Sequence, residues 1–143
     1  MTALNGSSPE PHSNGQHVVL AVDDDAAVRG MLARLLRSRG YTVLQATDSM
    51  DARKQLQRQR VDLVISDIVM PGESGIELRR AILKGWPELP VILVSGYSAD
   101  APAEFAARTP NTEFMQKPFA ADQLLALVAR MLGIVTPAPT APA

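Results

Sequence analysis

Two runs of apolar residues in this chain end in acidic side chains. One run is followed by three acids and the other by a single acid: Asp23, Asp24, Asp25 and Asp67. Strands that are apolar throughout are buried on both faces, as in a parallel sheet. Because the carboxyl ends of parallel strands lie at one edge of the sheet, where open α/β folds bind ligands, we expect these acids to meet there.

Carboxylates that meet in one place can all stay ionised only if a cation lies among them. The chain has no cysteine, so such an ion would be bound through oxygen or histidine, and Mg²⁺ prefers oxygen ligands. A carboxylate bound to such an ion can attack a phosphoryl group and form an aspartyl phosphate. Asp23, Asp24 and Asp67 are therefore the candidate metal ligands, with Asp67 as the reactive group, whereas Asp25 is expected to cap the following helix.

Two further polar side chains come at the ends of apolar runs. Ser95 is the last residue of one run, and Lys117 follows another. A phosphoryl group in transfer needs cations and hydrogen-bond donors around its oxygens. The Lys117 ammonium and the Ser95 hydroxyl can supply them, so the sequence contains a nucleophile, metal ligands, a cation and a hydroxyl.

Strand and helix patterns alternate five times between the two ends of the chain. The predicted strands are 17–22, 41–46, 61–66, 90–95 and 112–116. The first predicted helix begins after Asp25 and ends before Gly40, and the second begins at a cap on Asp48 or Ser49 and ends near 60. The other three predicted helices cover 75–84, part of 99–108, and 120–133. Alternating βα units predict a parallel sheet with helices on both faces. Five strands in this length fit a flavodoxin-like, doubly wound α/β fold with strand order 2-1-3-4-5.

Composition sets the remaining limits. The chain has 143 residues, a formal net charge of -1 and 46% hydrophobic residues, which suits a single globular domain. We expect a disordered arm at 1–16, the folded domain at 17–133 and a Pro/Ala-rich tail at 134–143. No apolar run approaches the length that spans a bilayer, so no membrane insertion and a cytoplasmic location are expected.

The second predicted helix is rich in basic side chains, which could suggest nucleic acid as a partner. These residues are Arg53, Lys54, Arg58 and Arg60. No aromatic residues that could stack on bases accompany them, and the overall charge is close to zero. We therefore interpret them as a solvated helix face and expect no direct binding of nucleic acid.

Four motifs together resemble the receiver domain of two-component response regulators. They are Val22-Asp23-Asp24-Asp25, the segment from Asp67 to Gly75, Val94-Ser95-Gly96, and Gln116-Lys117-Pro118-Phe119. The resemblance covers residues 17–133. It implies that Asp67 is the phospho-acceptor and takes its phosphoryl group from the phosphohistidine of a histidine kinase or a phosphotransfer protein.

The resemblance also implies roles for individual residues. Mg²⁺ would be held by Asp24, Asp67 and the backbone carbonyl of Val69, with Asp23 acting largely through water. Ser95 and Lys117 would contact the phosphoryl group, and the peptide bond between Lys117 and Pro118 would be cis.

A phosphorylated receiver is expected to change the face formed by its fourth helix, fifth strand and fifth helix, and so to control a protein partner. Phe114 lies where a rotating aromatic residue reports this change in the family, and Ser95 would be drawn toward the phosphate. The fourth helix is short and has Pro102 near its start, so it should open at low cost.

Several alternatives remain open from the sequence. The chain could be a single-domain regulator, a receiver excised from a hybrid histidine kinase, or a phosphate sink, and it could be a monomer or a phosphorylation-dependent dimer. An Mg²⁺-dependent phosphohydrolase with an aspartate nucleophile uses similar chemistry, but it commonly needs a second Asp where this chain has Val69. A flavin-binding module of the same fold needs a phosphate loop at residues 23–25, where three acids would repel a phosphate.

Overall fold

The computed structural model describes residues 17–96 and 100–134. Its elements are β2 (Val18–Val22), α1 (Ala26–Arg37), β3 (Thr42–Ala46), α2 (Ser49–Arg58), β4 (Leu63–Asp67), α3 (Gly75–Gly85), β5 (Val91–Ser95), α4 (Asp100–Ala107), β6 (Thr112–Gln116) and α5 (Ala121–Met131). The expected arm at 1–16 and the tail from 135 onward lie outside the described residues. Ile134 still packs against the core, so the described fold extends one residue past the predicted boundary.

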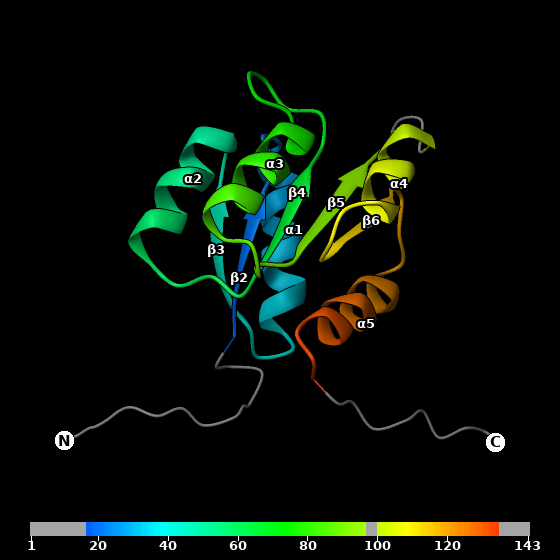
Figure 1. The fold of residues 1–143 in the computed structure, drawn as a ribbon. Helices are drawn as coiled ribbons and strands as arrows, with labels where there is room; N and C mark the ends of the chain where they lie inside the picture. Colours follow the sequence, from blue (N-terminus) through cyan, green and yellow to red (C-terminus); the bar gives the residue numbers. More distant parts are fainter. Residues whose placement is uncertain (1–16, 97–99, 135–143) are drawn as a thin grey trace.

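All five strands are parallel, in the order β3-β2-β4-β5-β6. This is the predicted 2-1-3-4-5 order of the flavodoxin-like fold, which is confirmed. Val22 of β2 pairs with Ser66, Asp67 pairs with Val94, and Ser95 pairs with Gln116. The carboxyl ends of four neighbouring strands are thus nearly level. They lie at the upper edge of the sheet in Figure 1.

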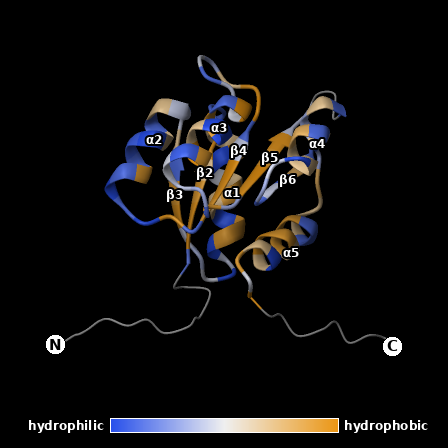
Figure 2. Ribbon diagram, viewed as in Figure 1, coloured by the Kyte–Doolittle hydropathy of each residue, from blue (hydrophilic) through white to orange (hydrophobic). Residues whose placement is uncertain are grey.

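Helices cover both faces of the sheet, with α1 behind the strands and α3 in front of them in Figure 1. One core cluster joins the strands to α1 and α5, for example through Leu36 and Leu124. The other joins them to α2 and α3, for example through Leu56 and Ile82. Figure 2 shows the hydrophobic strands between these more hydrophilic helices. Among the helices that the structure describes, none is both long enough and apolar enough to cross a membrane.

Polar caps fix where the helices begin. The Asp25 carboxylate accepts hydrogen bonds from the amides of Ala27 and Val28, as predicted for the start of α1. For α2 the cap is Asp48, which leaves the Ser49 side chain available for other contacts. Ser74 forms a capping box at the start of α3. These caps place the helix N-termini next to the strand ends that carry the acids.

Several predicted boundaries need correction: the strands predicted at 17–22, 41–46 and 90–95 each begin one residue later, and the helix predicted at 120–133 covers Ala121–Met131. The strand predicted at 61–66 begins at Leu63, because the Asp62 carboxylate accepts the Val18 amide at 2.7 Å, and it includes Asp67, which pairs with Val94. The helix predicted at 75–84 includes one more residue, Gly85, and Trp86 caps its end by donating its amide to the carbonyl of Ile82.

Candidate functional site

Three carboxylates meet at the carboxyl edge of the sheet. Asp23 and Asp24 follow β2, and Asp67 ends β4 on the neighbouring strand. One carboxylate oxygen from each lies within 4.8 Å of the others. Asp23 is buried, Asp24 is exposed and Asp67 is intermediate, so the group is open to solvent on one side. Three hard oxygen donors at this spacing fit Mg²⁺ and offer no soft ligand for other metals.

Lys117 brings a positive charge to the same place. Its ammonium lies 3.4 Å from Oδ2 of Asp23 and 3.8 Å from Oδ1 of Asp67. Its side chain is 28% exposed, whereas those of Asp23 and Asp67 are 3% and 12% exposed. The Lys117 backbone amide bonds to the Ser95 carbonyl at 2.8 Å, which fixes the chain direction after β6. The peptide bond to Pro118 is cis, as the resemblance implied.

Backbone contacts hold Asp23 in place. Its Oδ1 accepts a hydrogen bond from the amide of Asp25 at 2.9 Å, and its own amide bonds to the carbonyl of Ala46. The guanidinium of Arg29 donates to the Asp23 carbonyl at 2.7 Å and also bonds to Gln45. Arg29 therefore ties the acidic loop to α1 and β3, a role that the sequence analysis did not assign.

The environment of Asp67 disfavours its charge. Burial raises the pKa of the Asp67 carboxyl above its ordinary value. The Lys117 ammonium lowers that pKa, and the neighbouring charge of Asp23 raises it again. The nearby backbone amides of Ile68 and Val69 also lower the pKa of the Asp67 carboxyl and so favour its ionised form.

The other predicted site residues are Ser95, Val69 and Phe114, and not all of them lie beside the acids. Ser95 ends β5 and is buried, on the strand next to Asp67. Val69 lies in the loop after Asp67 and its side chain is 50% exposed. Phe114 lies further down β6, opposite Leu93, and packs half-buried against the core cluster that includes α3. The structure thus brings together Asp23, Asp24, Asp67 and Lys117, with Ser95 at the same edge and Phe114 away from it.

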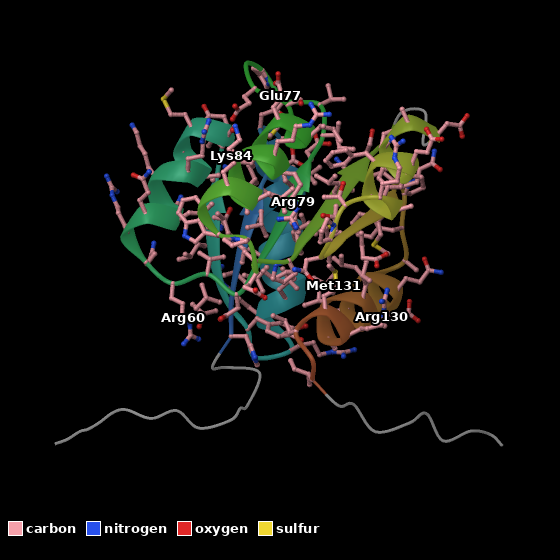
Figure 3. All side chains as sticks on the ribbon, viewed as in Figure 1. Arg60, Glu77, Arg79, Lys84, Arg130 and Met131 are labelled. Carbon is pink, nitrogen blue, oxygen red and sulfur yellow. The ribbon has the colours of Figure 1, made fainter. Side chains whose placement is uncertain are left out.

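Arg79 was missed by the sequence analysis. Its side chain is 0% exposed and lies in the middle of the molecule beside α3 in Figure 3. It donates to Thr112 Oγ1 at 2.7 Å and to the carbonyls of Leu89 and Pro110 at 2.9 and 2.7 Å. Burial lowers the pKa of Arg79 to about 10, so it stays protonated at neutral pH. No carboxylate in the described part of the chain pairs with it.

A pattern in the sequence could have revealed this burial. Residues spaced i, i+3, i+4 and i+7 form one stripe of a helix, and in α3 this stripe is Gly75, Leu78, Arg79 and Ile82. All four are buried. The periodicity therefore placed an arginine on the inner face of α3.

Comparison with known proteins identifies the family. The family model for the response regulator receiver domain matches residues 19–129. The chain belongs to this family, and it is a receiver domain of the kind used in two-component signalling.

Both kinases and regulators are among its relatives. It is 40% identical to the sensor kinase CckA of Brucella abortus over 121 residues, which are 83% of this chain and 13% of that protein. It is 33% identical to the nitrogen assimilation regulatory protein NtrX of Azorhizobium caulinodans, over 81% of this chain and 26% of NtrX. This chain therefore spans only a small part of these curated relatives.

Solved structures agree with the fold. A receiver protein from Pseudomonas putida has a TM-score of 0.75 and 34% identity, covering 80% of this chain and 96% of that one. The receiver domain from the hybrid histidine kinase CckA has a TM-score of 0.69 and 34% identity, over 80% of this chain and 98% of that one.

Proposed function

We propose that this receiver domain is the phospho-accepting component of a two-component phosphorelay. Asp67 takes a phosphoryl group from the phosphohistidine of a histidine kinase or a phosphotransfer protein. The bond between an Asp67 oxygen and phosphorus forms as the bond between phosphorus and the histidine nitrogen breaks, and the histidine keeps that electron pair. The observation that carries the proposal is the meeting of three carboxylates and one lysine at a single edge of the sheet.

Four groups of this chain would hold Mg²⁺: the carboxylates of Asp23, Asp24 and Asp67 and the backbone carbonyl of Val69. The spacing of the three carboxylates supports this ligand set. When bound, the ion would supply positive charge that offsets the charge on the phosphoryl oxygens.

Lys117 and Ser95 would supply the remaining contacts to the phosphoryl group. The Lys117 ammonium already lies 3.8 Å from Asp67, where it can reach oxygens attached to that side chain. The Ser95 hydroxyl is buried at the same edge of the sheet and can donate a hydrogen bond. Both contacts form only with the phosphorylated state and therefore stabilise that state over the unmodified one.

The phosphorylated form would change the face made by α4, β6 and α5 and so control a downstream protein. We further propose that the chain acts in the cytoplasm as a single-domain regulator, a monomer or a phosphorylation-dependent dimer. It would catalyse only its own phosphorylation and dephosphorylation. A receiver cut from a hybrid kinase, or a phosphate sink, would use the same site. The length of the native gene separates the excised receiver from the single-domain protein.

Incubation with acetyl phosphate and Mg²⁺, followed by intact mass measurement, tests the central chemistry. The wild type should gain one phosphate and Asp67→Asn should gain none, because the amide lacks the nucleophilic carboxylate. Asp25→Asn is the matched control, since Asp25 belongs to the same acidic run but caps α1. It should keep the adduct. An adduct on Asp67→Asn, or none on the folded wild type, would contradict the proposal.

A further inference from the structure

The loop between β4 and α3, residues 68–74, carries Val69 and borders the nucleophile. It leaves the sheet at the same edge as the first turn of α2, as Figure 1 shows. Its first two residues, Ile68 and Val69, directly follow Asp67, and the Ile68 amide bonds to the carbonyl of Val94 on β5 at 2.9 Å. The position of this loop, which we call the β4–α3 loop, therefore decides how Asp67 is presented.

Close packing holds the two ends of the β4–α3 loop. The Gly75 amide bonds to the Ile68 carbonyl at 2.9 Å, and a Cβ at Gly75 would clash with the Asp67 carbonyl oxygen. Such a contact leaves no room for any other residue at this position. The side chains of Ile68 and Met70 are buried in the core, whereas Pro71 and Gly72 are exposed. The middle of the loop thus lacks apolar packing of its own.

Glu73 joins this part of the loop to α2. Its carboxylate accepts a hydrogen bond from the Ser49 hydroxyl, and Arg53 Nη1 donates to both of its oxygens at 3.1 Å. Ser49 is buried, and the side chains of Arg53 and Glu73 are 46% and 32% exposed. Arg53, which the sequence pattern placed on a solvated face, thus forms an ion pair with the loop. Ser49 is free to bond Glu73 because Asp48 caps α2.

We infer that Glu73 is a positioning residue for phosphoryl acceptance: bound by Ser49 and Arg53, it holds the β4–α3 loop in place beside Asp67. This inference rests on the proposed function. The contact acts through geometry, since Glu73 belongs to neither the acidic group nor its lysine. When it is lost, the loop should move more widely and Asp67 should spend less time in its reactive position.

The test compares Glu73→Ala, Arg53→Ala and the double variant in two measurements. One is the rate of phosphorylation by acetyl phosphate at saturating Mg²⁺, and the other is amide hydrogen exchange of the β4–α3 loop in EDTA. Each single variant should slow phosphorylation by about 3- to 10-fold, because small displacements of a reacting group are costly. Exchange in the loop should speed up in the same variants. The double variant should be no slower than Glu73→Ala, because both changes remove one interaction.

Two controls make the result specific. Lys54→Ala removes a neighbouring cation of α2 that makes no ion pair among the described residues, so both measurements should match the wild type. Glu73→Gln keeps an oxygen acceptor for Ser49 and should recover part of the rate. A wild-type rate in Glu73→Ala would overturn the inference, as would a slow rate without faster exchange. Failure of the wild type to accept phosphate would instead reject the proposed function, and the exchange measurement would still report on the loop.

Discussion

The Asp67 carboxyl must be ionised to attack a phosphoryl group, yet its surroundings favour the protonated form. Burial is the largest cause of its raised pKa, and the charge of Asp23 adds to it. The amides of the β4–α3 loop and the Lys117 ammonium act in the opposite direction. A cation among the three carboxylates would favour ionisation further, which explains why a metal suits this site.

The raised pKa predicts how Asp67 affects stability in the absence of metal. A carboxyl whose pKa is higher in the folded than in the unfolded protein binds its proton more tightly when folded. The resulting stability is fully present below the ordinary value of 3.8 and is lost as the pH rises through the raised pKa. In EDTA at pH 7, Asp67→Asn should therefore be more stable than the wild type, and the difference should shrink as the pH falls toward about 4.

Urea unfolding of both proteins from about pH 4, near the ordinary carboxyl pKa, up to about pH 8 measures this difference. Glu88→Gln controls for the loss of one negative charge, since Glu88 is exposed just before β5 at the opposite edge of the sheet. If Asp67→Asn were instead less stable than the wild type at pH 7, the folded protein would favour the charge of Asp67 even without metal.

At the scale of elements, Arg79 connects α3 to the beginnings of β5 and β6. Its three short hydrogen bonds reach residues that are 10, 31 and 33 positions away in the sequence. These acceptors lie at the amino edge of the sheet, opposite the acidic site. Arg79 therefore fixes the turn that precedes β6, while the other end of β6 leads to Lys117.

Replacing Arg79 by Met should destabilise the fold by about 3 kcal/mol, because buried acceptors would lose charged donors. Arg80→Met is the matched control on the same helix. Arg80 is exposed and lies 5.4 Å over the Phe105 ring, a contact whose loss should cost about 1 kcal/mol or less. Urea denaturation compares the two. Equal stability of Arg79→Met and Arg80→Met would mean that the hydrogen bonds of Arg79 contribute little net stability.

Local patterns predicted much at this scale. The alternation of strands and helices, the cap at Asp25 and the acidic residues at the strand ends follow from apolar runs and capping preferences that are read from neighbouring residues. The strand order came from the fit of five such units to a known fold. The choice between Asp48 and Ser49 as cap could not be made, since both residue types suit that position. The hydrogen bond from Ser49 to Glu73 forms only because α2 packs against the β4–α3 loop, which the local sequence does not show.

Contacts between distant segments explain the rest. Arg29, Arg53 and Arg79 all bond to groups on other elements, and an arginine pattern alone does not reveal such partners. For Arg79 the helical period shows burial but not the acceptors. The geometry of Lys117 with Asp23 joins residues 94 positions apart and depends on the whole sheet being formed.

At the scale of the whole molecule, α4 is the helix with the fewest buried residues in the described part of the chain. Helix α4 has eight residues, and Ala106 is its buried residue. A groove of about 670 Å³ runs beside α4, β6 and α5 and is lined by Phe114 as well as by Arg130 and Met131, which Figure 3 labels on α5. Few apolar contacts therefore resist a shift of α4.

The register of β5 and β6 connects this face to the acidic site. Leu93 is opposite Phe114, and both belong to the core on the α3 side of the sheet. Because side chains alternate along a strand, Ser95 projects to the same side as Leu93, two residues nearer the acids. A movement of Ser95 toward a phosphate on Asp67 would thus open space on the side where Phe114 and α4 pack.

Beryllofluoride with Mg²⁺, which imitates the phosphoryl group, should therefore shift amide NMR signals across residues 100–116 as well as near Asp67. In Ser95→Ala the shifts beside Asp67 should remain and those in α4 and at Phe114 should weaken, because a ligand can favour one state only through contacts that differ between the two. Asp67→Asn should show neither set. Shifts confined to the acidic site in the wild type would mean that this face does not respond to the nucleophile, and the partner would then have to read the site directly.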